Sequence, residues 1–490
     1  MVSIKGFEPR EYQRKIADSC VRENTLVVVP TGLGKTKIAI LVAVDIINRD
    51  KGNILFMTPT RPLAAQIQRE FIDHTDVKDI ELVTGVISPS KRKELYHSSI
   101  VVSTPQTIEN DIKNKFIDLS NFSLIVFDEV HRAVKNFAYT GVAKAYKKVK
   151  GRMIGLTASP GEDIKKIEDI KNHLGIDHVE IRAEVDKDVK EYVQEKQIDN
   201  IKITLPDYYL NIIALLKNSY KKRLDQLEVY GYQKSVRYIR KTDILDFQKY
   251  LQRQIKQGNK FAYSGISLTA QLLKISHAIE LIETQGLKEC YVFLEAFKEE
   301  TTKAAKSILS DGYVIKAMSA MKDLDVYHPK VDKLKEIIEE QLIDFPETRV
   351  IIFAKFRATT KAICEALSNV AKPIELVGQK EGLKQSEQIQ RIQDFGSGKY
   401  NVMVCTNVGE EGLDIASADV AIFYDQTGTS IRKIQRAGRV GRMQAGRIIN
   451  LIARGTRDES LYYASNANVK KMQSTLTGMK KNTTLGEFSG

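Results

Sequence analysis

Several features that mark other classes of protein are scarce or missing in this chain of 490 residues. It has only four cysteines, which lie far apart at Cys20, Cys290, Cys364 and Cys405. That spacing argues against a zinc-binding motif or a disulfide framework and favours a reducing, cytoplasmic location. No apolar run approaches the length that spans a bilayer, and residues 1–6 lack the apolar core of a signal peptide, so we expect no membrane association.

Acidic residues are also in short supply. The chain has 62 Asp and Glu against 75 Lys and Arg, which gives a net charge of +13. This balance favours a polyanionic partner such as nucleic acid, although a basic surface without a ligand would give the same count. The length predicts about two to four domains, each with its own hydrophobic core.

The most informative stretch that is present lies near the N-terminus. An apolar run, Leu26–Val29, predicts a buried strand; Pro30–Thr36 then reads Pro-Thr-Gly-Leu-Gly-Lys-Thr, and a helix pattern begins near Ile38. Strand, glycine-containing loop, Lys-Thr and helix form the order of a phosphate-binding loop. The glycines let backbone amides turn toward phosphate oxygens, the lysine neutralises their charge, and the threonine hydroxyl suits Mg²⁺.

A second predicted strand, Leu124–Phe127, runs directly into two carboxylates, Asp128 and Glu129. Adjacent acids at the end of an apolar strand fit a hydrolytic site in which Asp128 holds Mg²⁺ and Glu129 polarises the attacking water. A solvated acidic turn is the alternative. His131 has no second His or Cys nearby, so we expect it to hydrogen-bond to a neighbouring motif and not to bind a metal.

Further predicted strands end in similar loops. Residues 53–57, 80–83 and 100–103 each lead into a loop that carries Thr, Pro or Gly. Because the carboxyl ends of parallel strands meet at one edge of a sheet, these loops predict a binding surface there. The strand at 153–156 leads into Thr157-Ala158-Ser159, whose hydroxyl groups either relay the state of the γ-phosphate or cap the next helix.

From about residue 205 to 327 the pattern becomes helical. Within it, residues 221–260 hold eleven Lys and Arg against four acids, a net charge of +7, with five Tyr and Phe interleaved. Basic residues with aromatic rings suit contacts to a nucleic-acid backbone, and Lys234, Arg237 and Arg240 are candidates for them. The alternative is a solvated helix face whose aromatic rings belong to the core.

A second α/β pattern follows, with predicted strands at 349–354, 375–378, 401–405 and 420–424 and no second phosphate-binding loop. Gln435–Arg442 places three arginines and a glutamine among glycines, which suits an anion-facing segment better than a core. The sequence therefore predicts an α/β fold in which two parallel-sheet domains are separated by an all-helical insertion.

In this order, the motifs Pro30–Thr36, Asp128–His131, Thr157–Ser159, Thr406–Ile415 and Gln435–Arg442 resemble those of superfamily 2 helicases. The segments 104–110, 277–287 and 408–414 are similar to the archaeal Hef helicases and to their relative, the Fanconi anaemia group M translocase. The viral-RNA sensors and Dicer share the inserted architecture. The resemblance covers nearly the whole chain and implies RecA-like domains at 1–204 and 328–465, a nucleic-acid-gripping helical insertion at 205–327, and a C-terminal tail at 466–490.

The resemblance also implies roles for single residues, with ATP and Mg²⁺ as cofactors. Around the nucleotide, the implied residues are Arg10 and Gln13 for adenine, Thr31, Gly32, Gly34, Lys35 and Thr36 for the phosphates, Thr36 and Asp128 for Mg²⁺, Glu129 for the nucleophilic water, and Asp414 near the ribose or Mg²⁺. Across the cleft, Gln435, Arg439 and Arg442 are implied to reach the γ-phosphate. Contacts to the nucleic-acid backbone are implied for Arg61, Thr84, Gly85, Thr104, Arg357 and Thr406.

The activity implied is an ATP-dependent DNA helicase or translocase that acts on branched or forked DNA in replication-fork repair, associated with the nucleoid. Two alternatives stay open: an ATPase stimulated by double-stranded RNA, and a DNA-binding scaffold that ATP switches between bound and free forms. The chain departs from the Hef pattern at Ala437 and Val440, where Arg and Thr are usual, and it carries no Glu-Arg-Lys nuclease motif.

The C-terminal tail offers a separate hypothesis. Leu485 and Phe488 lie three residues apart after a polar stretch, which resembles a peptide that binds a sliding clamp. Asn482 stands where such peptides usually have Gln. A disordered tail without a partner is the alternative.

Overall fold

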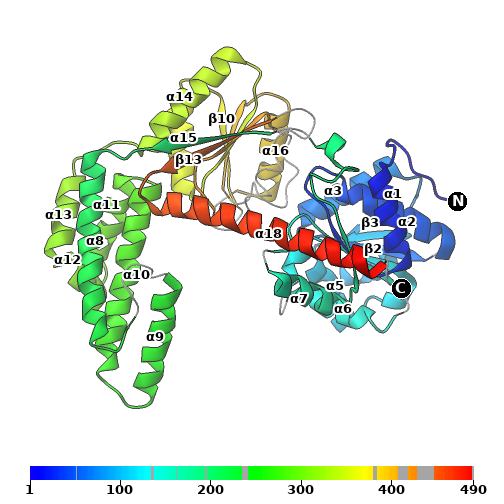
Figure 1. The fold of residues 1–490 in the computed structure, drawn as a ribbon, viewed down its shortest axis with the longest axis horizontal. Helices are drawn as coiled ribbons and strands as arrows, with labels where there is room; N and C mark the ends of the chain where they lie inside the picture. Colours follow the sequence, from blue (N-terminus) through cyan, green and yellow to red (C-terminus); the bar gives the residue numbers. More distant parts are fainter. Residues whose placement is uncertain are drawn as a thin grey trace.

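The structure is a computed structural model that describes residues 1–50, 52–133, 137–149, 151–161, 163–193, 196–233, 241–378, 383–406, 418–427 and 446–487. It consists of two parallel β-sheets, each covered by helices, and a helical bundle beside the second sheet (Figure 1). The bundle lies at one end, the second sheet in the middle and the first sheet at the other end. The predicted fold class is therefore confirmed.

The first sheet has seven parallel strands in the order β3-β4-β2-β5-β6-β1-β7. Its strands are β1 (Thr25–Val28), β2 (Asn53–Met57), β3 (Ile80–Val83), β4 (Ile100–Ser103), β5 (Phe122–Asp128), β6 (Arg152–Thr157) and β7 (His178–Ile181). Its helices are α1 (Glu11–Arg22), α2 (Lys35–Asp50), α3 (Arg61–His74), α4 (Pro89–Leu95), α5 (Pro105–Lys113), α6 (Ala138–Tyr146) and α7 (Ile164–Leu174).

Alternation along the central strands creates two cores. In and just after β1, Val27 and Val29 pack with α1 and α2, whereas Leu26 and Val28 pack with α6 and α7 on the opposite face. All four side chains are buried because a parallel sheet is covered by helices on both sides. The strand order places the ends of β5, β6 and β1 side by side, so the acid pair, Thr157 and the phosphate-binding loop share one edge.

The second sheet has six parallel strands in the order β10-β11-β9-β12-β13-β8. These are β8 (Lys196–Ile203), β9 (Val350–Phe353), β10 (Pro373–Leu376), β11 (Val402–Cys405), β12 (Val420–Phe423) and β13 (Gly446–Ala453). Helices α14 (Pro329–Asp344) and α15 (Arg357–Leu367) cover one face, and α16 (Gln385–Gly396) covers the other.

Strand β8 crosses the boundary that the sequence suggested. The range 1–204 was assigned to the first domain, but Lys196–Ile203 pairs along its whole length with β13 in the second sheet. From Ile198 to Ile203 the exposure of β8 alternates as in an edge strand, but an exposed position is the apolar Ile198, so the strand carries a weak signal in sequence. Strands β7 and β13 were also not predicted from the sequence.

The bundle contains six α-helices in its described residues, between β8 and α14. They are α8 (Asp207–Glu228), α9 (Lys241–Lys256), α10 (Ala262–Thr284), α11 (Leu287–Glu295), α12 (Lys303–Leu309) and α13 (Gly312–Met321). Their shared core includes Tyr209, Leu216, Ile275 and Leu294. Helix α10 lies against α8, α9, α11 and α12 and is therefore the central helix of the bundle. None of the described helices is long and apolar enough to cross a membrane.

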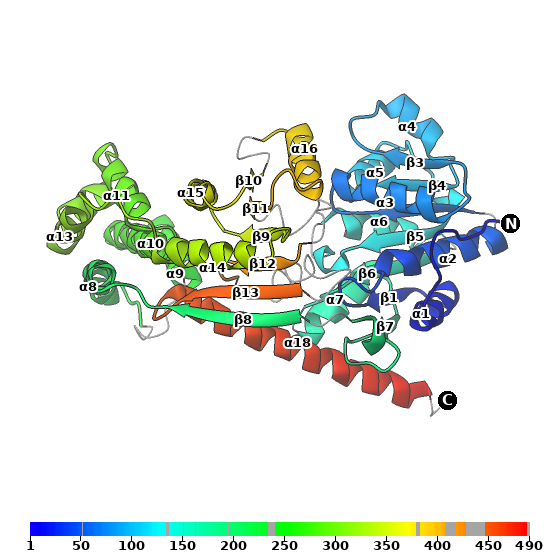
Figure 2. The same ribbon diagram turned by 90° about the horizontal axis from the view of Figure 1, so that it is seen from above.

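The predicted C-terminal tail is instead the greater part of a long helix, α18 (Arg457–Glu487), which runs from the second sheet to the first (Figures 1 and 2). Leu476 and Met479 pack against one core of the first sheet, and Lys480 Nζ lies 2.7 Å from Asp186 Oδ2. Together with Met472 these residues recur at helical spacing, so a docked apolar stripe explains why the segment is ordered. The interpretation of a disordered tail is wrong for the described part of this segment.

Candidate nucleotide and nucleic-acid sites

The predicted phosphate-binding loop has a backbone that glycine favours. Gly32 and Gly34 adopt φ angles of 82° and 74°, in the left-handed region. A Cβ on Gly34 would lie 2.5 Å from Gln13 Nε2, so this position also needs glycine for space. Helix α2 begins at Lys35, whose Nζ lies 3.4 Å from the carbonyl oxygen of Val29. The loop and the start of α2 thus have the strand, loop and helix order that a phosphate-binding loop requires, while phosphate binding itself stays a prediction.

Helix α1 holds this loop from outside. The Tyr12 hydroxyl donates to the carbonyl oxygen of Leu33 at 2.6 Å, and Gln13 Nε2 donates to the same oxygen at 3.3 Å. Gln13 is only 3% exposed, so its side chain is directed into the molecule toward this loop. The guanidinium of Arg10 lies over the ring of Tyr192, 4.3 Å from its centroid. Gln13 therefore contacts the loop directly and Arg10 lies at the start of the same helix, while their contact with adenine stays a prediction; Tyr12 and Tyr192 are additions from the structure.

The two carboxylates lie at the end of β5. Glu129 has φ 51° and ψ 50°, a left-handed conformation that is uncommon for a residue with a side chain and concentrates at functional sites. Its backbone N–H donates to Asp128 Oδ1 at 3.0 Å. The Tyr139 hydroxyl donates to the carbonyl oxygen of Asp128 at 2.6 Å. These bonds fix the backbone that carries both acids.

The two acids differ in their affinity for a proton. Burial, and then the charge of Glu129, raise the pKa of Asp128 above its ordinary value. Burial acts in the same direction on Glu129, but its hydrogen bond from His131 and the nearby charge of Lys35 lower its pKa overall. When two close carboxylates share a site, one keeps a proton more readily than the other. Glu129 is therefore the member of the pair that is more readily ionised.

His131 connects the acid pair to the next strand end. Its Nδ1 lies 3.3 Å from Glu129 Oε2 and 3.4 Å from Thr157 Oγ1, which confirms the predicted hydrogen bond to a neighbouring motif. Thr157 Oγ1 also accepts from the backbone N–H of Ser159 at 3.1 Å. The Ser159 hydroxyl reaches Met472 Sδ on α18 at 3.1 Å. The hydroxyl groups of this loop thus contact His131, beside the acid pair, on one side and α18 on the other.

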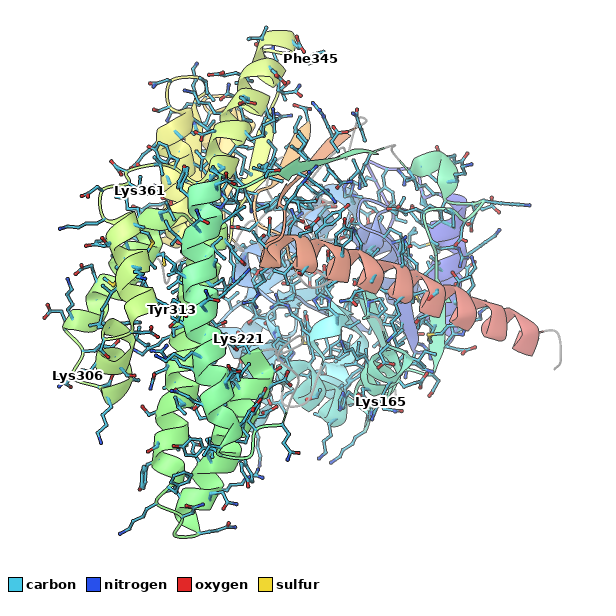
Figure 3. All side chains as sticks on the ribbon, turned by 60° about the vertical axis from the view of Figure 1, so that its left-hand side comes forward. Lys165, Lys221, Lys306, Tyr313, Phe345 and Lys361 are labelled. Atoms are coloured by element: carbon cyan, nitrogen blue, oxygen red, sulfur yellow. The ribbon has the colours of Figure 1, made fainter. Side chains whose placement is uncertain are left out.

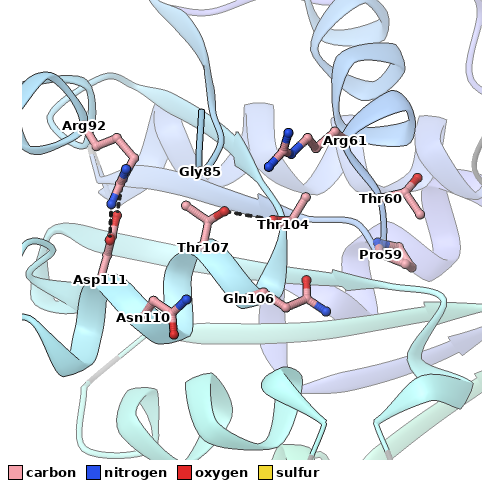
Figure 4. A pocket seen from close by; sticks show the side chains of 10 residues that line it. All are labelled: Pro59, Thr60, Arg61, Gly85, Arg92, Thr104, Gln106, Thr107, Asn110 and Asp111. Carbon is pink, nitrogen blue, oxygen red and sulfur yellow. Dashed lines mark hydrogen bonds and ion pairs between the residues drawn. The ribbon is translucent and has the colours of Figure 1, made fainter. Parts of the chain in front are cut away.

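A cavity of about 520 Å³ opens at the ends of β2, β3 and β4 (Figure 4). Three of the predicted nucleic-acid residues, Arg61, Gly85 and Thr104, line it together, and Thr84 lies next to Gly85 in the chain. The Thr104 and Thr107 hydroxyls are 2.9 Å apart. Arg61 has no ion-pair partner within the described residues, so its charge is available to an anion. The remaining lining residues, which were not predicted as contacts from the sequence, are Pro59, Thr60, Arg92, Gln106, Thr107, Asn110 and Asp111.

The cavity has a buried ion pair in its wall. Arg92 Nε and Nη2 donate to the two carboxylate oxygens of Asp111 at 2.6 and 2.7 Å, and the Tyr96 hydroxyl donates to Asp111 Oδ2 at 2.6 Å. Asp111 is fully buried. Asp111 neutralises Arg92, so Arg61 is the arginine of this wall that has no acidic partner within the described residues. No local pattern in the sequence marks a pair that lies 19 residues apart.

On the second sheet, Arg357 follows β9 and Thr406 follows the neighbouring strand β11. The two residues therefore lie at the carboxyl ends of adjacent β-strands. Both were predicted from the resemblance to contact the nucleic-acid backbone. Arg357 is exposed, whereas Thr406 is buried. The predicted residues Asp414, Gln435, Arg439, Arg442, Lys234, Arg237 and Arg240 lie outside the described residues.

Part of the basic stretch at 221–260 has a structural role. Arg223 is 3% exposed and forms an ion pair with Asp311 inside the bundle, so it does not face a ligand. Tyr232 is also buried and packs edge-on against Phe247. For these residues the structural alternative is correct. Lys221 and Lys222 on α8 are exposed and remain candidates for contact with a polyanion.

The clamp-peptide hypothesis does not gain support. Leu485 falls within α18 and not in an extended peptide, and Phe488 lies outside the described residues. None of the relatives named below is called a clamp-binding protein.

Three family models match this chain. Residues 10–167 match "DEAD/DEAH box helicase", residues 208–328 match "Putative ATP-dependent RNA helicase, helical bundle", and residues 329–444 match "Helicase conserved C-terminal domain". The three models therefore cover most of the first sheet, the bundle and most of the second sheet.

Similar proteins come from archaea and fungi. The helicase domain of Hef from Pyrococcus furiosus has a similar structure, with a TM-score of 0.74 and 40% identity over 93% of this chain and 98% of that one. "Putative ATP-dependent RNA helicase MJ1505" of Methanocaldococcus jannaschii is 37% identical over 98% of this chain and 62% of its own length. "ATP-dependent DNA helicase mph1" of Neurospora crassa is 32% identical over 95% of this chain. The chain spans about 42% of the length of the Neurospora protein. By its motifs, its fold and these matches, the chain belongs to the superfamily 2 helicases of the DEAD/DEAH type, ATP-dependent hydrolases, in the group of the Hef helicase domain.

Proposed function

We propose that this protein is an ATP-driven DNA helicase or translocase that acts on forked or branched DNA. The observation that carries the proposal is the arrangement of the first sheet. Its phosphate-binding loop and acid pair lie on the same edge as the cavity that Arg61 lines. A site that hydrolyses ATP and a site that holds a polyanion therefore share one rigid sheet, and hydrolysis can change the grip on a strand.

In the nucleotide site, Gly32, Gly34 and the start of α2 face the phosphates with backbone amides, and Lys35 adds its charge. Arg10 and Gln13 face the adenine. Glu129, the more readily ionised acid, orients the attacking water and accepts its proton. For Gln435, Arg439 and Arg442 we propose the role that the sequence resemblance implies, which is contact with the γ-phosphate. Guanidinium groups can neutralise the charge that develops on the transferred phosphoryl group.

Mg²⁺ fits the donor set at this site. The hydroxyl of Thr36, at the start of α2, and the carboxylate of Asp128, at the end of β5, are the hard oxygen donors that Mg²⁺ prefers beside phosphates. When bound, the ion would neutralise phosphate charge. No cluster of three or more His, Cys, Asp or Glu within the described residues could hold a metal by itself, which agrees with a site that substrate oxygens complete.

We propose that one strand of the nucleic acid lies across the carboxyl ends of the β-strands in both sheets. Arg61, Gly85 and Thr104 contact its backbone on the first sheet, and Arg357 and Thr406 contact it on the second. The cavity wall offers hydroxyl and amide groups besides Arg61, and these suit phosphate and sugar contacts, which position a strand without reading its sequence. We therefore expect binding that is independent of base sequence.

The names of the fungal relatives support DNA as the substrate, because these proteins are called DNA helicases. RNA is a second candidate, since the archaeal relative and the helical-bundle family carry RNA helicase in their names. Strand displacement with the full chain separates the two. We expect ATP-dependent displacement on forked DNA and little on a forked RNA of equal length. Lys35→Ala should abolish displacement. Displacement by Lys35→Ala at the wild-type rate would contradict the ATP-driven mechanism.

A further inference from the structure

The central helix of the bundle carries two buried acids near its C-terminal end. Glu280 and Glu283 on α10 are 8% and 3% exposed. They lie in the segment 277–287, which is similar to the Hef helicases in sequence but which the proposed catalytic site does not use. Burying a carboxylate costs free energy unless a cation or several hydrogen-bond donors compensate it. The partners of these acids therefore indicate what the segment does.

Two of the three partners of Glu280 come from outside the bundle. Lys355, directly after β9, forms an ion pair with Glu280 Oε1 through its ammonium group. Arg457, the first residue of α18, donates from Nη1 to Glu280 Oε2 at 3.2 Å. His277 Nδ1, on α10 itself, lies 3.9 Å from Glu280 Oε2. His277 and then Lys355 lower the pKa of Glu280 to about 2, so this carboxylate is ionised throughout the physiological range.

Glu283 makes the same connection through the backbone. Its Oε2 accepts from the backbone N–H of Arg457 at 2.9 Å, at the start of α18. Its own carbonyl oxygen lies 3.2 Å from Nε2 of His328, the residue that caps α14. One turn of α10 thus contacts the β9–α15 loop and the first residues of α14 and α18.

A second set of contacts completes the ring within the second sheet. Lys330, which is fully buried, lies 2.8 Å from Asp458 Oδ2 and 3.9 Å from Asp425 Oδ1. Asp425 Oδ2 accepts from the backbone N–H of Lys355 at 2.6 Å. Asp458 follows Arg457 in the chain. We call this ring of Glu280, Lys355, Asp425, Lys330, Asp458 and Arg457 the α10 junction.

The position of Lys355 gives the junction its significance. Its ammonium group is held by the bundle and its backbone N–H by the second sheet, and the next residues are Phe356 and Arg357. Arg357 begins α15 and is a proposed strand contact. The side chains of Lys355 and Arg457 are each 45% exposed, which weakens their ion pairs, but the carboxylate that they share is buried and depends on both cations. What these pairs supply is the orientation of two bodies.

We propose that Glu280 is a positioning residue: through Lys355 and Arg457 it locks the helical bundle to the second sheet and sets the loop that presents Arg357 to the nucleic-acid strand. The bundle and the second sheet then move as one body relative to the first sheet. DNA that binds to the bundle thereby also affects the position of the carboxyl ends of the β-strands in the second sheet. The effect on DNA binding rests on the proposed function. The mechanical coupling of the bundle to the second sheet does not depend on it.

The coupling is tested by spin labels on the full chain. Lys306 on the bundle and Lys361 on α15 are exposed, both are labelled in Figure 3, and each would be changed to Cys. Cys364→Ser removes the half-buried native thiol, and the other three cysteines are buried. In Glu280→Gln an amide nitrogen faces one of the two cations. We expect a narrow distribution of label distances in the reference protein and a broad one in Glu280→Gln.

Glu300→Gln is the matched control. Glu300 forms an ion pair with Lys274 of α10 at 2.6 Å, but the pair lies wholly within the bundle. We expect this variant to keep the narrow distribution. If Glu280→Gln is as narrow as the control, the locking role is refuted, whatever the protein's substrate.

The consequence for the reaction is measured as ATPase activity against DNA concentration. Loss of a charge-assisted hydrogen bond that positions a contact should raise KM for forked DNA about tenfold and leave kcat at saturating DNA nearly unchanged. A broad label distribution with an unchanged KM would refute the positioning of Arg357. Absence of stimulation of the wild-type protein by any nucleic acid would instead refute the proposed function, while the label distances still decide the coupling.

Discussion

The buried ion pair in the wall of the strand-end cavity leads to a quantitative prediction. Asp111 on α5 is fully buried and accepts two hydrogen bonds from Arg92 and one from the Tyr96 hydroxyl. Asp111→Ala would leave a buried guanidinium without a counter-charge. Removal of one partner from such a pair costs about 3–5 kcal/mol. This is a large share of the stability of a typical domain, so we expect α4 and α5 to open locally.

Hydrogen exchange reports this opening directly. The amide of Tyr96 donates to Arg92 at the end of α4, and the amide of Ile108 donates to Thr104 in the first turn of α5. A loss of about 3–5 kcal/mol corresponds to exchange that is about a hundred- to several thousand-fold faster at these amides. Because the two helices line the cavity, KM for DNA in the ATPase assay should rise in the same variant.

Two further variants decide whether the reasoning holds. Glu109→Ala removes an exposed ion pair with Lys113 on the same helix, and such pairs contribute about 0.5 kcal/mol, so exchange should hardly change. The combination Arg92→Met, Tyr96→Phe and Asp111→Leu removes all three polar side chains and leaves only the partly buried carbonyl oxygen of Ile87 without its donor, so it should recover most of the protection. Exchange at Tyr96 and Ile108 that is no faster in Asp111→Ala than in Glu109→Ala would refute the assigned role of the pair.

Three other predictions concern catalysis, pH and salt. Glu129→Gln should lower kcat for ATP hydrolysis by about 10²–10⁴-fold and leave the affinity for a fluorescent ATP analogue nearly unchanged, because only the proton acceptor is lost. Burial lowers the pKa of His328 to about 3 from its ordinary 6.5, and its ring bonds the carbonyl of Glu283. Below pH 6.5 the His328 ring therefore binds a proton in the unfolded chain but not in the folded chain. Urea unfolding should show a free energy of unfolding that is about 2 kcal/mol lower at pH 5 than at neutral pH, and His328→Gln should lack this decrease. Lys221→Gln with Lys222→Gln should weaken DNA binding and reduce the slope of log K against log salt by about 0.9 for each phosphate that the variant no longer neutralises.

Each of these three predictions would be contradicted by a specific experimental result. Equal loss of ATP affinity and kcat in Glu129→Gln would place this residue in binding and not in proton transfer. A flat stability between about pH 7 and pH 5 would show that the His328 ring takes up a proton in the folded state. An unchanged salt slope would remove Lys221 and Lys222 from the binding surface.

Local chemistry explains what could be predicted from the sequence. The phosphate-binding loop and the acid pair are marked by short-range order: a buried strand, then residues whose function requires them at the strand end. Arg61, Gly85 and Thr104 could be placed together because successive parallel strands present their carboxyl ends at one edge. The hydrogen bond of His131 followed from the lack of a second metal ligand.

Pairing between distant segments explains what could not be predicted. Strand β8 is recognisable only beside β13, whose Asn450 lies opposite Asn200 and 250 residues later in the chain. The ion pair of Arg92 and Asp111 and the α10 junction have no local pattern, since each joins separate elements. The apolar stripe of Met472, Leu476 and Met479 can be recognised as a docking surface only from its contacts with the first sheet, which the sequence does not show. In the bundle, burial of Arg223 shows that a count of basic residues overestimates a binding surface.

The measurement that tests the proposed function most directly is the rate of ATP hydrolysis by the full chain with forked DNA, single-stranded DNA and duplex RNA at matched nucleotide concentration and salt. We predict the highest kcat/KM with forked DNA, a lower value with single-stranded DNA and little stimulation by duplex RNA. Strongest stimulation by duplex RNA would contradict the assignment to DNA, and hydrolysis that no nucleic acid stimulates would contradict the coupling of the two sites.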